Sequence, residues 1–298
     1  MRLVPLAATL AALVCALAPA AQAQSDAPGD SYTGAFRLNP GTADKPDPIA
    51  EPAGASFSAD TTNYGTQGDI FSPPGTGGGP EPNICSPARY GKTAWAWLYT
   101  PRWVQADVRA SAGFDPVIAL MPFRTPSKPV LDARGGICSN LSTSTTETMG
   151  DTLPIVGPGW YAVQVGGVGA TGGSLTTQVH LLPPPAVHAV TGIAARRSSG
   201  AALVSLHARV PKGARVFLRC LRQNCGRLKG VASARDARTH TYLRGKAVPD
   251  GARLELRVTA RGYIGFYSAW DVKKGALSRA IVRCMEPSSS RPRATCDG

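Results

Sequence analysis

Short runs in which apolar and polar residues alternate constrain the fold of this 298-residue chain more than any other feature. In residues 104–110, Val and Ala alternate with Gln, Asp and Arg. This period of two places alternate side chains on opposite faces of a β-strand. The chain also holds 33 Gly and 26 Pro, which interrupt helices and favour turns. We therefore predict an all-β chain of short antiparallel strands.

Runs with the character of strands lie in both halves of the sequence. Those of the first half are residues 93–100, 104–110, 117–121, 151–156, 160–165 and 174–181. Those of the second half are residues 202–210, 214–221, 254–260 and 263–272. The spacing predicts a β-sandwich of jelly-roll type in the first half. In the second half, runs with one apolar face and arginines on the other predict a small immunoglobulin-like β-sandwich.

The formal net charge of +13 is divided unevenly along the chain. Residues 24–186 hold 9 basic and 13 acidic residues, a net charge of −4, whereas residues 187–298 hold 22 basic and 6 acidic residues, a net charge of +16. Such an asymmetry favours two separate units. We expect a Pro- and Gly-rich arm at 24–91 with a flexible loop at 71–82, a β-sandwich core at 92–182, a stiff proline linker at 183–186 and a basic domain at 187–298.

The first 23 residues have the composition of an export signal. Arg2 precedes an apolar stretch, Leu3–Leu17, and Ala21-Gln22-Ala23 has the small-residue pattern of a cleavage site. No later stretch approaches the ~18 apolar residues that a membrane span needs. The sequence therefore predicts a secreted or envelope-associated protein without a transmembrane anchor.

Removal of the signal leaves an even number of cysteines, which indicates disulfides in an exported chain. They are Cys85, Cys138, Cys220, Cys225, Cys284 and Cys296. We expect Cys85 to pair with Cys138, because these two are alone in the first half. The other four allow three pairings. Ease of local closure favours Cys220 with Cys225 and Cys284 with Cys296, and the sequence leaves this choice open.

Four short motifs in the first half carry a resemblance to a known family. They are Gly91-Lys92-Thr93-Ala94-Trp95, Phe114-Asp115-Pro116-Val117-Ile118, the run from Gly159 to Gly167, and Gly173-Ser174-Leu175. In order and spacing, this stretch resembles the bacterial pre-peptidase C-terminal (PPC) domain from about Asp30 to Leu182. The resemblance implies a β-sandwich of jelly-roll type that accompanies secreted enzymes and surface proteins.

The second half resembles a domain of secreted proteins from high-GC actinobacteria that has no established activity. The segments that carry this resemblance are PKGARVFLRC, VPDGARLELRVTARGYIG and VRCMEPSSSRPRATC. The resemblance supports the fold and export and implies nothing about chemistry.

The sequence offers no convincing catalytic or cofactor motif. Residues 167–172 match G-x-G-x-x-G, but a predicted strand follows them where a dinucleotide site needs a helix, so we interpret them as a hairpin loop. The four histidines lack the spacing of a zinc protease, and no G-x-S-x-G elbow is present. We predict a protein that is not an enzyme and holds no metal or cofactor. The alternative is a secreted hydrolase with a dispersed active site.

Two features of the first half are candidates for binding. Trp95, Trp97 and Tyr99 share one face of a strand, where flat rings could stack on sugars. The alternative is packing inside the sandwich, where aromatic side chains supply much of the buried area. Asp115 could hold a cation or orient a loop, and the alternative is a hydrogen bond that stabilises a turn.

Arginines at outward positions of the second half form the other candidate. A contiguous basic surface attracts polyanions through counterion release. The residues we assign to it are Arg209, Arg215, Arg219, Arg257 and Arg261, with Arg222, Arg227 and Arg253 nearby. No signature of sequence-specific nucleic-acid recognition is present. We therefore expect a non-catalytic module that contacts cell-wall or other acidic polysaccharide. A purely structural extracellular protein is the remaining alternative.

Overall fold

The computed structural model describes most of the chain between residues 27 and 296. The described ranges are 27–30, 34–51, 53–65, 84–85, 88–125, 128–131, 136–141, 143–150, 153–223, 225, 230–233 and 239–296. The predicted export signal, the 71–82 loop and Arg227 lie outside them. Within these ranges all regular secondary structure is β-strand, which confirms the predicted all-β class. None of the described residues forms a helix able to span a membrane.

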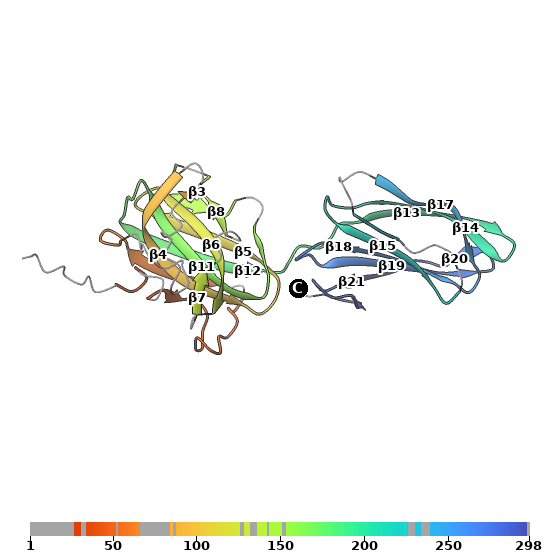
Figure 1. The fold of residues 1–298 in the computed structure, drawn as a ribbon, viewed down its shortest axis with the longest axis horizontal. Helices are drawn as coiled ribbons and strands as arrows, with labels where there is room; N and C mark the ends of the chain where they lie inside the picture. The colour runs from red at the N-terminus through yellow and green to blue at the C-terminus, as the bar shows by residue number, and fades with distance from the viewer. Residues whose placement is uncertain are drawn as a thin grey trace, which may run out of the picture.

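The first twelve strands form a β-sandwich, which we call the first sandwich (Figure 1). The larger sheet has the order β1 (Phe36–Arg37), β4 (Ala88–Thr100), β11 (Gly159–Val168), β6 (Pro116–Thr125) and β7 (Lys128–Leu131), with β3 (Ile84–Cys85) beside β4 and β8 (Ile137–Ser139) beside β6. The facing sheet has the order β10 (Ile155–Val156), β5 (Val104–Ala112), β12 (Ser174–Leu182) and β2 (Ala55–Asp60), with β9 (Thr146–Thr148) beside β5.

The core of the first sandwich follows from the alternation in its strands. In β5, Val104, Ala106, Val108 and Ala110 are buried between the sheets. The segment that the sequence indicated as an arm adds further apolar side chains to the same core. These are Leu38, Ile49, Phe57 and Tyr64. The arm therefore contributes to the hydrophobic stabilisation of the sandwich.

The remaining strands form the second sandwich (Figure 1). Its smaller sheet has the order β13 (Val190–Ser198), β14 (Ala201–Arg209) and β17 (Thr239–Pro249). Its larger sheet has the order β16 (Gly230–Ser233), β15 (Arg215–Leu221), β18 (Arg253–Thr259), β19 (Gly265–Lys273), β21 (Ile281–Met285) and β22 (Pro292–Arg293), with β20 (Ala276–Leu277) beside β19. The buried faces of β14, β15 and β18 meet in one hydrophobic core.

The cysteines pair as Cys85–Cys138, Cys220–Cys225 and Cys284–Cys296. The first pairing confirms the prediction, and the other two are those that local closure favoured. The disulfides indicate folding in an oxidising compartment. Residues 169–173 connect β11 to β12, so a strand follows the glycine-rich motif as predicted. The two strands belong to different sheets, so this loop crosses between the sheets and the predicted hairpin is wrong.

Candidate functional site

The outer face of the larger sheet in the second sandwich carries a cluster of arginine and acidic side chains. In β18, Leu254, Leu256 and Val258 point into the core. The alternation therefore places Arg253, Glu255 and Arg257 on the opposite face. The register pairs Arg219 of β15 with Glu255 and Tyr267 of β19 with Arg257, so their side chains gather on that face.

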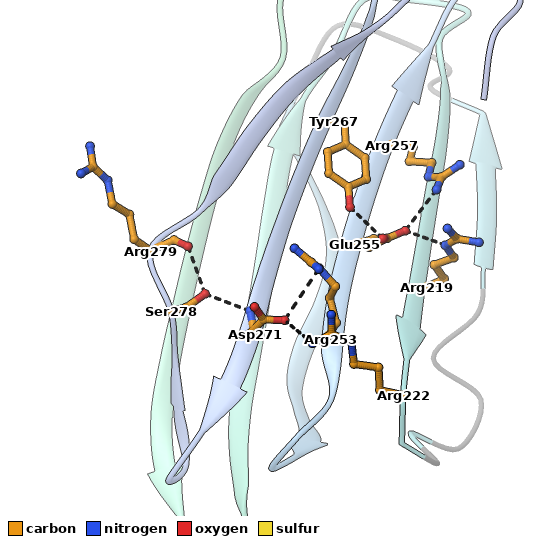
Figure 2. Close-up of polar contacts among 9 residues, drawn as sticks. All are labelled: Arg219, Arg222, Arg253, Glu255, Arg257, Tyr267, Asp271, Ser278 and Arg279. Carbon is orange, nitrogen blue, oxygen red and sulfur yellow. Dashed lines mark hydrogen bonds and ion pairs between the residues drawn. The ribbon is translucent and has the colours of Figure 1, made fainter. Parts of the chain in front are cut away.

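Glu255 is the centre of a buried ionic network (Figure 2). Its Oε2 accepts hydrogen bonds from Arg219 Nε at 2.6 Å and from Arg257 Nη2 at 3.3 Å, and its Oε1 accepts one from the Tyr267 hydroxyl at 2.7 Å. Burial alone would raise the pKa of Glu255, but these hydrogen bonds and the two guanidinium charges outweigh it and hold the pKa below its ordinary value. Burial and the bond to Glu255 raise the pKa of Tyr267.

A second acidic residue holds two more arginines on this sheet (Figure 2). The Asp271 carboxylate lies 3.2 Å from Arg222 Nη1 and 3.7 Å from Arg253 Nε. The backbone N–H of Asp271 donates to Ser278 Oγ, which in turn donates to the carbonyl of Arg279. Glu255 and Asp271 together therefore compensate much of the positive charge of Arg219, Arg222, Arg253 and Arg257.

Arg215 and Arg261 lie together beside this network and line one pocket of about 450 Å³, which we call the cationic pocket. Both side chains are exposed, and neither forms an ion pair with any residue in the described part of the chain. Thr259, Tyr263 and Ser288–Ser290 add hydroxyl and backbone groups to the lining. Glu286 also lines it, with its carboxylate 4.0 Å from Arg293. The lining can offer two guanidinium groups and several hydroxyls to an anion.

The predicted basic residues therefore separate into three groups. Arg215 and Arg261 share the cationic pocket, and Arg219 and Arg257 bind Glu255. Arg209 is the last residue of β14 and belongs to the other sheet. The alternation in β18 places Glu255 on the outer face together with the arginines, yet its side chain is buried beneath its partners.

The aromatic stripe of β4 is largely enclosed. Trp95 is 0% exposed and Trp97 is 7% exposed. They pack in a cluster with Met121, Phe123 and other apolar residues on the outer face of the larger sheet. Tyr99 is half-buried, and its ring lies 5.1 Å from that of Trp160. This burial favours packing over sugar stacking, because a sugar cannot stack on a ring without an open face. The rings pack on the outer face of the larger sheet, and not inside the sandwich as the alternative supposed.

Asp115 lies in the loop between β5 and β6. Burial raises the pKa of its carboxyl group, and the charge of Glu147 raises it further. Its Oδ1 has no hydrogen-bond partner among the residues that the structure describes, so within them the predicted turn-stabilising bond does not form through this atom. Among the described residues, no group of three or more His, Cys, Asp or Glu is placed to hold a metal ion.

A second pocket, of about 570 Å³, lies where the two sandwiches meet, and we call it the junction pocket. Trp103, Ile155 and Tyr161 line it from the first sandwich, and Arg261 lines it from the second. The guanidinium carbon of Arg261 lies over the Trp103 ring, 5.8 Å from its centroid. Trp103 was not singled out by the sequence, because it lies outside the predicted strands and next to no recognisable motif.

No family model and no curated protein sequence matches the chain, so the PPC resemblance stays a prediction. Solved structures that align with it include a glycoside hydrolase domain, Endo-D, of Streptococcus pneumoniae R6, at 10% identity and a TM-score of 0.18, over 78% of this chain and 43% of that one. A β-glucuronidase of Ruminococcus gnavus aligns at 9% identity and a TM-score of 0.19, over 81% of this chain and 46% of that one. The chain thus spans less than half the length of these structures. At such TM-scores the alignments carry no argument about activity.

Proposed function

We propose that this protein is an extracellular, non-catalytic module that binds acidic polysaccharide, such as that of a cell envelope, through the cationic pocket. The observation that carries the proposal is the pairing of Arg215 and Arg261 in one pocket, exposed and without an ion-pair partner among the described residues. Guanidinium groups donate in a planar fork that fits carboxylate, sulfate and phosphate groups.

The distribution of charge in the second sandwich supports this choice of pocket. Arg219 and Arg257 already donate to Glu255, and a ligand would have to compete with a buried carboxylate for them. Arg215 and Arg261 have no ion-pair partner within the described ranges, so an external anion does not have to displace a carboxylate from them. Glu286, in the same lining, offsets part of their charge. The net charge of +16 over residues 187–298 adds a long-range field that steers polyanions towards this sandwich.

The proposal is tested by retention of the chain without its predicted signal, residues 24–298, on immobilised polygalacturonate and on neutral dextran. At low salt we expect retention on the acidic polymer alone. The Arg215→Ala/Arg261→Ala double variant should elute at clearly lower salt, because about two counterion-releasing contacts are lost.

The matched control is Arg196→Ala/Arg197→Ala, which removes the same charge from exposed positions on β13 in the opposite sheet. It should elute close to wild type. A wild-type chain that passes through the acidic column at low salt would overturn the proposal, as would equal losses of retention in the two double variants.

A further inference from the structure

Arg261 belongs to both pockets, since it lines the cationic pocket on one side and the junction pocket on the other. We propose that the two pockets form one bipartite site for a chain of uronic-acid sugars, in which carboxylates bind at the cationic pocket and the apolar face of a sugar ring lies in the junction pocket. This inference rests on the proposed function and adds to it the class of polysaccharide and the participation of the first sandwich.

The walls of the junction pocket suit the face of a pyranose ring. Trp103, Leu120, Pro122, Ile137 and Ile155 present apolar atoms to it. Ile137 is 42% exposed, which leaves a large apolar side chain open at this place. Pyranose rings carry C–H groups on their faces, and these C–H groups pack on aromatic and aliphatic surfaces.

The polar groups of the two pockets favour a hydroxylated anion over a bare polyanion. The cationic pocket adds Thr259, Tyr263 and three consecutive serines to its two arginines, and sugar hydroxyls can exchange hydrogen bonds with these groups. In the junction pocket Arg261 is the one cationic side chain of the lining that the structure describes. A polyphosphate has no apolar face, so any unit in the junction pocket would place charged oxygens against an apolar wall, which is costly. A uronic-acid ring can turn its C–H face to that wall and its carboxylate away from it.

The contact between the sandwiches fixes Arg261 in this shared position. A side-chain carbon added at Gly262, whose φ is +78°, would lie 2.9 Å from Trp103 Cε3, so a residue without a side chain is needed where the second sandwich meets this tryptophan. The Trp103 ring then supports the neighbouring Arg261 guanidinium through a cation–π contact. The hydroxyl of Tyr161 accepts a hydrogen bond from the Gly157 N–H at 2.9 Å and lies 3.1 Å from the Gly157 carbonyl oxygen, to which it donates. These contacts help to order the same wall.

The test compares two ligands, a galacturonic-acid oligosaccharide and inorganic polyphosphate, by titration calorimetry with residues 24–298. The first variant is Ile137→Asn, which replaces an exposed apolar side chain of the wall by an uncharged polar one. The control is Val190→Asn, which makes a comparable change at a residue that is 70% exposed on β13. The melting temperature of each variant confirms that it is folded.

We expect Ile137→Asn to weaken binding of the oligosaccharide by about tenfold, while binding of polyphosphate changes much less, because only a sugar ring uses the apolar wall. A second variant, Arg261→Lys, keeps the charge but loses the planar group over Trp103, and it should also weaken the oligosaccharide more than polyphosphate.

The outcomes separate this inference from the proposed function. If wild type binds both ligands and neither variant discriminates between them, the bipartite site is wrong and the cationic pocket stands. If wild type binds neither ligand, the proposed function fails and this inference fails with it. Equal losses for Val190→Asn and Ile137→Asn would also overturn the inference, because the effect would then not depend on the wall of the junction pocket.

Discussion

Glu255 determines which arginines of the second sandwich are available to a ligand. Its side chain is 7% exposed, and its carboxylate binds the guanidinium groups of Arg219 and Arg257, which are themselves only partly exposed. Without it, two neighbouring positive charges would face each other in a region with little water. Removing one partner of a buried ion pair costs more than the pair contributes, because the remaining charge is left uncompensated.

We predict that Glu255→Gln lowers the free energy of unfolding by about 2 kcal/mol at neutral pH, less than for a fully buried pair because the arginines are partly exposed. The pKa of Glu255 is lowered in the folded state. Its contribution is therefore present above its unfolded pKa of about 4.3 and is lost as the pH falls through the lower folded value. Urea denaturation at neutral and acidic pH measures this difference.

The control for this prediction is Glu286→Gln, whose carboxylate lies 4.0 Å from Arg293 on the surface and should change stability by less than about 0.5 kcal/mol. The two variants should converge as the pH falls below the folded pKa of Glu255. Equal stability of the two variants at neutral pH would show that the network does not act as described.

At the scale of the strand, the sequence predicts those strands in which apolar and polar residues alternate. β5 and β14 carry a clear period of two, and both lie where the sequence placed them. β13 was missed because its side chains are almost all exposed at the edge of a sheet, so one face has no apolar pattern to detect. The burial of Glu255 was missed for another reason. It depends on register, which brings Arg219 and Tyr267 from neighbouring strands to cover it.

The disulfides give a prediction at the same scale. Cys85–Cys138 joins positions 53 residues apart, and the loop-entropy model assigns it about 4 kcal/mol. Cys284–Cys296 spans 12 residues, and the same model assigns it about 3 kcal/mol. We expect Cys85→Ser/Cys138→Ser to lower the unfolding transition of the first sandwich and Cys284→Ser/Cys296→Ser that of the second.

Differential scanning calorimetry of the two variants resolves the transitions, and tryptic peptides of the oxidised wild type check the pairing. If both variants lower the same transition, the assignment of one disulfide to each sandwich is wrong.

At the scale of the whole molecule, the two sandwiches differ in charge and meet at a tryptophan and an arginine. Residues 24–186 carry a net charge of −4 and residues 187–298 a net charge of +16, so the positive charge lies on one side of the junction. The proposed binding of polyanions belongs to that side. Arg261, next to Trp103, lies at the boundary between them. The charge asymmetry could be predicted from the sequence. The junction pocket could not, because it depends on a contact between residues far apart in the chain, which no local sequence pattern indicates.

The salt dependence of polygalacturonate binding tests the central claim most directly. We predict that the logarithm of the affinity of wild type falls linearly with the logarithm of the salt concentration, as expected when bound cations are released from the polymer. In the Arg215→Ala/Arg261→Ala variant this slope should be less steep, by the amount that corresponds to about two lost cation-releasing contacts. An unchanged slope in this variant, or a wild-type affinity that does not depend on salt, would contradict the assignment of the cationic pocket.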